Sequence, residues 1–107
     1  MSLIINFKTS KLWREKVERF SNRLSNLFGE RLELVASLPS PNDLIYDSNV
    51  LVVLDEVKAD DLEAVASLAP EDVNPLVVPS SDVRAIDAFL CRGGVVEGKR
   101  RKQGRSP

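Results

Sequence analysis

The chain has 107 residues, enough for one small domain, and its 43% hydrophobic and 29% charged residues are typical of a globular protein rather than a disordered one. It contains no histidine and one cysteine, Cys91, which excludes catalytic triads that need histidine, His-ligated metals and an internal disulfide from this chain alone. The longest apolar run, residues 50–54, is far too short to span a membrane. Because the N-terminus does not read as a signal peptide, we expect a cytoplasmic protein.

The charge is divided unequally along the chain. The last ten residues contribute +5 to an overall charge of −1, so residues 1–97 carry −6. We expect residues 1–98 to form a single domain and residues 99–107 a basic, disordered tail. The tail is either a solvated extension or a nucleic-acid contact. Its basic residues are Lys99, Arg100, Arg101, Lys102 and Arg105.

The first element expected is a helix over residues 11–28. Apolar residues at alternating spacings of four and three form one face, namely Trp13, Val17, Phe20, Leu24 and Leu27. Gly29 follows, where a left-handed residue commonly ends a helix. Lys16, Arg19 and Arg23 form a basic stripe on another face, which is either solvated or a binding site. Glu15 is spaced to pair with Arg19 at i, i+4.

Two strands and a loop are expected next. Residues 31–38 alternate in polarity as a strand does, and prolines, Asn42 and Asp43 then indicate a loop. The apolar, β-branched run Val50–Leu54 is typical of a strand covered on both faces, in the middle of a sheet.

Helices and strands alternate in the remainder of the chain. A helix is expected over residues 60–68, followed by a strand over 73–78. Because Pro75 lacks an N–H for the sheet, this strand is expected either to lie at a sheet edge or to enter the sheet late. A third helix is expected over 82–91, with Ser80 or Ser81 as its cap. Its expected apolar face consists of Val83, Ile86, Phe89 and Leu90. With a final strand at residues 95–96, the order is α-β-β-α-β-α-β. We therefore expect an α+β fold with a mixed sheet and helices packed mainly on one side.

Several segments together resemble the minimal nucleotidyltransferase family, the small relatives of polymerase β-type nucleotidyltransferases. Ala36-Ser37 stands where that family has Gly-Ser, and Asp47-Ser48-Asn49, after nine intervening residues, stands where it has Asp-x-Asp. The strand that follows ends in Leu54-Asp55, and Asn74 lies where a third aspartate is common. The similarity covers roughly residues 11–99 and rests on the order and spacing of these segments.

The resemblance implies a site for Mg²⁺ and a nucleoside triphosphate. Magnesium prefers hard oxygen ligands, usually carboxylates and phosphates, and the family supplies three aspartates. By analogy, Asp47, Asn49 and Asn74 occupy the catalytic positions, Asp47 is the metal ligand, and Ala36 and Ser37 occupy the phosphate-binding positions. Two of the three carboxylates are asparagines here, so the metal site is degenerate. Without the resemblance, Tyr46 to Asn49 would be interpreted as a simple turn.

Three functional hypotheses follow. In the first, the domain is weakly active or inactive and works through a protein partner, because the resembled family often pairs with a small helical HEPN-type protein as toxin and antitoxin. The second is an active nucleotidyltransferase that uses Mg²⁺ as cofactor. The third is a nucleic-acid-binding module that uses the basic tail. An inactive domain would need no cofactor.

Overall fold

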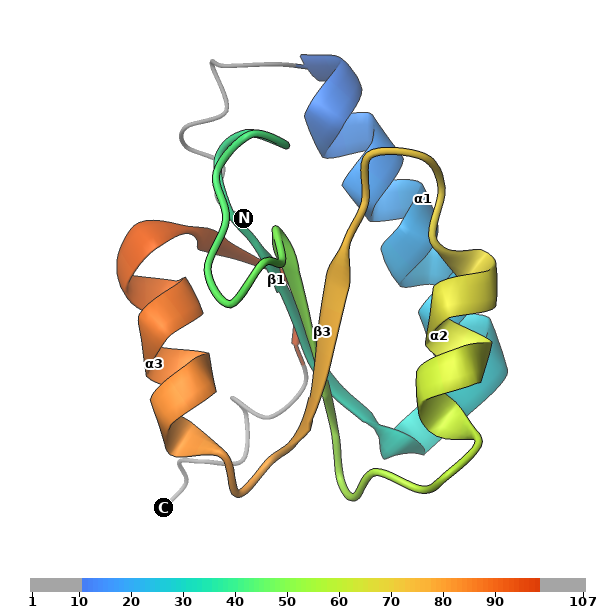
Figure 1. The fold of residues 1–107 in the computed structure, drawn as a ribbon. Helices are drawn as coiled ribbons and strands as arrows, with labels where there is room; N and C mark the ends of the chain where they lie inside the picture. Colours follow the sequence, from blue (N-terminus) through green and yellow to red (C-terminus); the bar gives the residue numbers. More distant parts are fainter. Residues whose placement is uncertain (1–10, 99–107) are drawn as a thin grey trace.

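The computed structural model describes residues 11–98, so the expected basic tail lies outside the described residues. Three helices, a short 3₁₀ helix and four strands follow one another in the expected order (Figure 1). They are α1 (Lys11–Phe28), η2 (Gly29–Arg31), β1 (Leu32–Ser37), β2 (Val50–Leu54), α2 (Asp61–Leu68), β3 (Pro75–Pro79), α3 (Val83–Arg92) and β4 (Gly94–Gly98).

The four strands form one mixed sheet with the order β3-β2-β1-β4. Strand β1 is antiparallel to both β2 and β4, whereas β2 and β3 are parallel. All five residues of β2 are buried, as the uninterrupted apolar run Val50–Leu54 predicts. Strand β3 begins at Pro75, ends at Pro79 and lies at a sheet edge, which confirms the position inferred from Pro75. The fold is therefore the expected α+β class.

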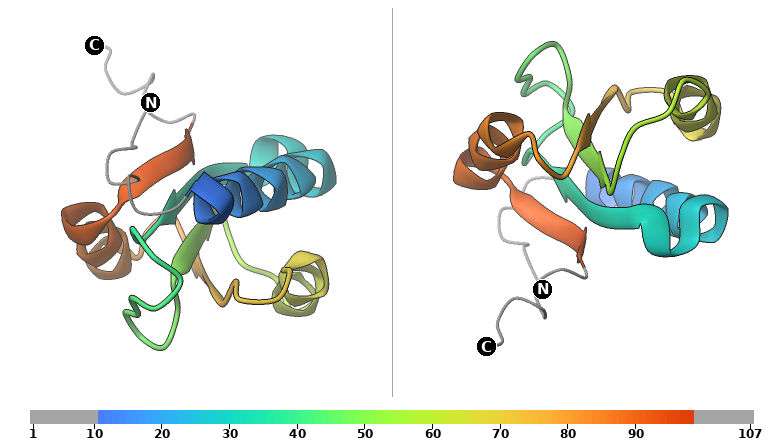
Figure 2. Two further views of the ribbon diagram at one scale, coloured as in Figure 1. Left: turned by 90° about the horizontal axis from the view of Figure 1, so that it is seen from above. Right: turned by 90° about the horizontal axis from the view of Figure 1, so that it is seen from below.

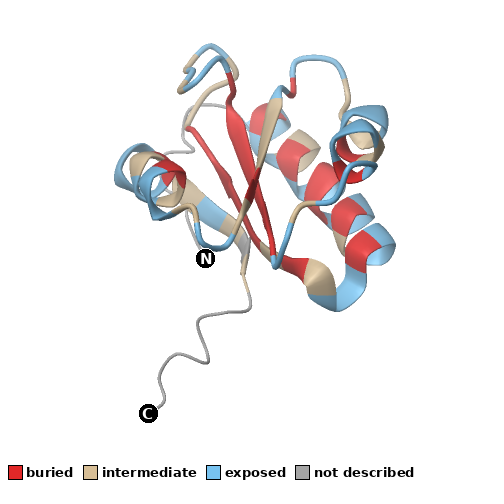
Figure 3. Ribbon diagram, turned by 60° about the horizontal axis from the view of Figure 1, so that its bottom comes forward, coloured by how far each residue is buried: buried red, intermediate tan, exposed pale blue. Residues whose placement is uncertain are grey.

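Helices cover both faces of this sheet, two on one face and one on the other (Figures 1 and 2). The strand period of two sends Val50, Val52 and Leu54 into the cluster under α1 and α2, and Leu51 and Val53 into the cluster under α3. The first cluster is centred on Trp13, Val17, Phe20, Leu24, Val35 and Val65, the second on Leu34, Ala36, Leu38, Ala85 and Phe89. Figure 3 shows the buried residues concentrated in the central strands and on the inner sides of the helices.

The helix faces differ from the expected ones at their ends. Leu27 is 52% exposed, and Phe28, four residues after Leu24, is buried instead. On α3, Val83 is 64% exposed and Leu90 is also exposed, because the helix packs through a narrow stripe, Ala85 and Phe89.

The helix ends show where local hydrogen bonding overrides the expected pattern. Asp82 caps α3 in place of the two preceding serines, and its carboxylate accepts a hydrogen bond from the Ala85 N–H at 3.2 Å. Gly29 has φ +59° after α1, as expected. A Cβ on Gly93 would lie 2.0 Å from the Ser37 carbonyl oxygen, so only glycine permits the close passage from α3 into β4.

Within residues 11–98, no helix is long and apolar enough to cross a membrane.

Candidate functional site

Asn49 lies at the end of the sheet where β1 ends and where β2 and β3 begin. Its side chain is fully buried, and its Nδ2 donates hydrogen bonds to the carbonyl oxygens of Pro41 at 3.0 Å and Asp72 at 2.8 Å. Its Oδ1 accepts from the Asn74 N–H at 2.9 Å. Both amide N–H groups and the amide oxygen are therefore engaged with backbone groups of two separate loops, which they hold together.

The backbone of Asn49 extends this network to α1. Its N–H donates to the Asn74 carbonyl, and its carbonyl accepts from the Leu38 N–H, each at 3.0 Å. The Leu38 carbonyl in turn accepts from Trp13 Nε1 at 2.9 Å in a buried position. A continuous set of hydrogen bonds thus joins helix α1, the end of β1 and the start of β3 through Leu38 and Asn49.

The loop before Asn49 ends in a tight hairpin turn. Ile45 and Ser48 exchange backbone hydrogen bonds of 2.8 and 2.9 Å, and the two residues between them, Tyr46 and Asp47, have φ +56° and +61°. This is a two-residue turn of type I′, in which asparagine and glycine are strongly preferred. A tyrosine in the left-handed region is disfavoured by contact of its Cβ with the backbone, so the turn is strained at Tyr46.

The structure brings some of the predicted site residues together. Asn49 and Asn74 are linked directly, and Ser37 pairs with Val50 one position along the strand. Asn74 enters this contact through its backbone, whereas Asp47 is exposed in the turn. Two of the predicted positions, Asn49 and Asn74, thus form one linked structural unit.

Ala36 and Ser37 lie inside β1, which is paired on both sides. Ala36 pairs with Leu51 and Val95, and Ser37 with Val50 and Gly94. Both residues are buried, and Ala36 belongs to the core under α3. This stretch of backbone is committed to the sheet rather than arranged as an open phosphate-binding loop.

The donor set at this edge does not fit a magnesium ion with a triphosphate. The Asn49 amide oxygen already accepts a backbone hydrogen bond in a buried position, which leaves Asp47 as the one carboxylate among the three metal-ligand positions. Among the described residues, no three or more Asp, Glu, Cys or His side chains are grouped to hold a metal. Magnesium needs several hard oxygen ligands in octahedral geometry, and the three predicted positions do not supply them.

The opposite end of the sheet carries an ion pair. The Arg31 guanidinium donates to both carboxylate oxygens of Asp61, and the Lys58 N–H donates to the same carboxylate at 2.7 Å. The Arg31 hydrogen bond lowers the pKa of Asp61 below its usual value of 3.8, and the partial desolvation of the carboxyl opposes this shift. The pair fastens the start of α2 to the segment that enters β1.

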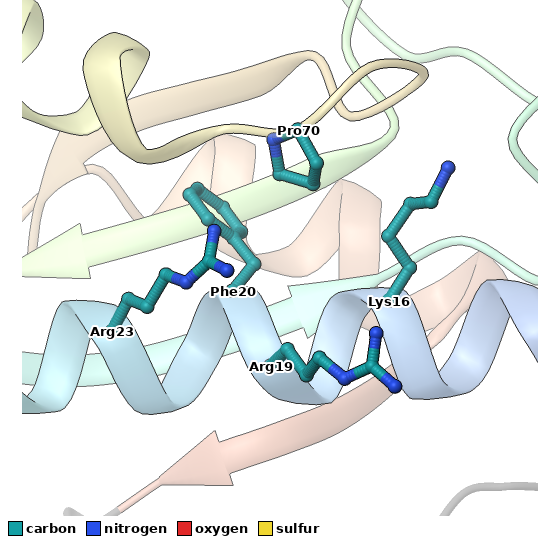
Figure 4. Close-up of a pocket in the computed structure, with 5 residues that line it drawn as sticks. All are labelled: Lys16, Arg19, Phe20, Arg23 and Pro70. Atoms are coloured by element: carbon teal, nitrogen blue, oxygen red, sulfur yellow. The ribbon is translucent and has the colours of Figure 1, made fainter.

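A basic recess lies between α1 and the segment after α2 (Figure 4). It has a volume of about 100 Å³, and its lining consists of Lys16, Arg19, Phe20, Arg23 and Pro70. Lys16 Nζ donates to the Glu71 carbonyl at 3.2 Å and lies 3.3 Å from the Asp72 carboxylate. The sequence reveals the basic stripe, but Pro70, which is about 50 residues away along the chain, gives no such signal.

The expected ion pair between Glu15 and Arg19 does not form in the described part of the chain, where Arg14 pairs with Glu18 at 3.9 Å instead. Both pairs have the i, i+4 spacing, so the spacing alone does not choose between them. Arg19 instead lines the basic recess.

Comparisons with known proteins add no assignment: no protein-family model, no curated protein and no solved structure matches the chain.

Proposed function

We propose that this chain is a nucleotidyltransferase-like domain with a degenerate metal site, catalytically weak or inactive, that acts by binding a protein partner. The observation that carries the proposal is Tyr46, a residue that is 58% exposed at the tip of a strained turn. The resemblance described above makes a small helical HEPN-type protein the expected partner, in an antitoxin-like pair located in the cytoplasm.

Burial of the Tyr46 side chain does not offset the strain at this residue, since Tyr46 is exposed. A left-handed bulky residue costs about 1–2 kcal/mol, and an exposed ring gains little packing energy in return. Such strain persists where the surrounding structure enforces it, commonly at binding sites. Tyrosine is also enriched among the residues that dominate protein interfaces.

The loop presents Tyr46 as part of a fixed, apolar tip. Leu44 is exposed beside it, while the following Asn49 holds the loop through Pro41. A loop fixed in this way loses little conformational entropy when a partner binds. In the resembled family the same segment leads to the metal ligands, whereas here its buried amide groups bind the backbone and its apolar side chains face outward.

The proposal is tested with a tagged full-length chain expressed in its own host, with three forms compared by quantitative mass spectrometry. Tyr46→Gly removes the ring and suits the left-handed backbone. Leu62→Ser changes an exposed leucine of similar exposure on α2 and serves as the control. We expect a small helical protein to be retained by the wild type and by Leu62→Ser, and lost from Tyr46→Gly. Equal retention by all three forms would exclude this loop as the interface.

The catalytic part is tested separately by calorimetry with magnesium and a nucleoside triphosphate. We expect no metal-dependent triphosphate binding by the wild-type chain, because the Asn49 amide is not available as a ligand. Tight, metal-dependent binding would overturn the degenerate-site proposal and favour an active Mg²⁺-dependent nucleotidyltransferase.

A further inference from the structure

Helix α1 is a basic element in an otherwise acidic domain. It carries five Lys or Arg and two Glu, a net charge of +3. Residues 29–98 carry four Lys or Arg and fourteen Asp or Glu, a net charge of −10. Positive potential in the described domain is therefore concentrated along one helix.

Three of the five cations of α1 line the basic recess described above. Lys16, Arg19 and Arg23 line it, and Phe20 and Pro70 supply its apolar part. Figure 4 shows Lys16 and Arg23 on either side of Phe20, along the side of α1 that faces Pro70. A volume of about 100 Å³ is several times what one water molecule needs.

Two of these three cations lack a partner within the part of the chain that the structure describes. Arg19 and Arg23 are exposed and make no hydrogen bond or ion pair with any residue in the described range 11–98. Lys16 donates a hydrogen bond to the Glu71 carbonyl and forms an exposed ion pair with the Asp72 carboxylate. Arginine presents donors in a planar fork that matches phosphate oxygens in pairs, so the recess offers two guanidinium groups to an incoming anion.

Helix stability does not explain this distribution of charge. The first turn of α1 contains no acidic residue and the last turn no basic one, although the helix dipole favours acids at the N-terminus and bases at the C-terminus. Lys11 and Arg14 stand instead in the first turn. The positive end of the helix dipole adds to their charge and strengthens attraction for anions near this end of the helix.

We propose that the basic recess of α1 is a phosphate-binding site, and that its ligand is the backbone of a single nucleic-acid strand. A single carboxylate would pair with one cation. Lys16, Arg19 and Arg23 are spread over about 10 Å of helix. This spread suits a nucleic-acid strand, because every nucleotide carries a charged phosphate. The recess has no exposed aromatic ring for stacking, so recognition is of the backbone and is independent of base sequence. This surface is separate from the Tyr46 loop.

The test is fluorescence anisotropy of a labelled twelve-nucleotide single strand with the full-length chain, over a series of salt concentrations. Arg19→Gln/Arg23→Gln removes two charges from the recess. Arg84→Gln/Arg92→Gln removes two exposed charges from α3 and is the matched control. We expect the α1 double variant to lose at least about tenfold in affinity and its log–log salt slope to become shallower by about 1.4, the value for two phosphate contacts of a single strand.

The other arms separate this proposal from its competitors. We expect the α3 control and Tyr46→Gly to bind the strand as the wild type does, and inorganic triphosphate to compete only weakly. An equal loss in both double variants, or no loss in the α1 variant, would overturn the site, because binding would then depend on total charge or on residues outside the recess. An acidic peptide that binds the recess as tightly as the strand would overturn the choice of ligand.

Discussion

The two ends of the central sheet are fastened by opposite kinds of chemistry. At one end the neutral amide of Asn49 connects two loops to the start of β2 through three hydrogen bonds to backbone groups. At the other end an ion pair, Arg31 with Asp61, connects η2 to α2. The amide is fully buried, whereas the Arg31 side chain is 30% exposed.

This difference indicates which end of the sheet can accommodate a charged side chain. A buried amide whose donors and acceptor are all hydrogen-bonded stabilises the fold and does not titrate. It depends on having both donor and acceptor groups in the right places. A partly solvated ion pair tolerates small displacements, is screened by salt and responds to pH. Asn49, at a position that the resemblance equates with a carboxylate, carries no charge, and its buried amide has a structural role.

The largest expected effect comes from placing a carboxylate at position 49. Asn49→Asp would place carboxylate oxygen against the carbonyls of Pro41 and Asp72, which now receive hydrogen bonds. We expect a loss of about 3 kcal/mol or more in the free energy of unfolding, as for an unpaired buried charge. The measurement is urea denaturation at pH 7.

The control for that variant is Asn74→Asp. Asn74 is exposed and joins the network through its backbone, so we expect a change within about 0.5 kcal/mol. If Asn49→Asp proved as stable as the wild type and also bound magnesium, the structural role of Asn49 would be wrong.

A smaller loss is expected from the helix end of the same network. Trp13→Phe keeps most of the buried ring but removes the donor to the Leu38 carbonyl. Leaving that buried acceptor unpaired should lower the free energy of unfolding by about 1–3 kcal/mol. Thermal unfolding followed by circular dichroism measures it, and an unchanged midpoint would mean that the Leu38 carbonyl finds another donor.

Most of the fold could be predicted from the sequence because burial leaves a local pattern. The uninterrupted run Val50–Leu54 predicted a strand buried on both faces, and Pro75 predicted an edge. The packing of α3 could not be predicted in the same way, since Val83 and Leu90 are apolar but exposed. Which apolar residues of a short helix face the sheet depends on how the helix docks, and the sequence does not state this.

The candidate site was less accessible to prediction for a different reason. Asn49 and Asn74 were singled out only through a family resemblance, and in the structure the Asn74 N–H donates a hydrogen bond to Asn49 Oδ1. The hydrogen bonds of Asn49 reach Pro41 and Asp72, which lie 8 and 23 residues away. Every residue has a backbone carbonyl, so the sequence does not show which carbonyls an amide side chain will bind. From sequence alone, an asparagine that binds backbone groups therefore cannot be distinguished from an asparagine at a metal site.

The pH dependence of the free energy of unfolding should distinguish the end of the sheet with the ion pair from the end with the amide. Because the pKa of Asp61 in the folded chain lies below its usual 3.8, the pair stabilises the fold fully above that range and loses its contribution as the pH falls through the folded value. Asp61→Asn should therefore be less stable than the wild type at pH 7, by less than Asn49→Asp, and the difference should shrink as the pH falls below about 4. Urea denaturation at several pH values measures this.

Asn49→Ala is the matched comparison for that experiment, since an amide does not titrate. Its loss of stability relative to the wild type should be the same at pH 7 and at the acidic end of that series, below pH 4. A loss that instead decreased in parallel with that of Asp61→Asn would mean that the two ends of the sheet are not independent.

The smallest expected effect is a gain, at the strained turn. Tyr46 has φ +56° with an exposed ring, and glycine adopts this conformation without contact of a Cβ with the backbone. Tyr46→Gly should raise the free energy of unfolding by about 0.5–1 kcal/mol, after allowance for the greater freedom of glycine in the unfolded chain. Tyr46→Ala keeps a Cβ and should give no gain, so the urea midpoints of the two variants isolate the backbone strain from the loss of the ring. A destabilised Tyr46→Gly would mean that the ring packs on its own domain, and the argument for a partner at this turn would lose its basis.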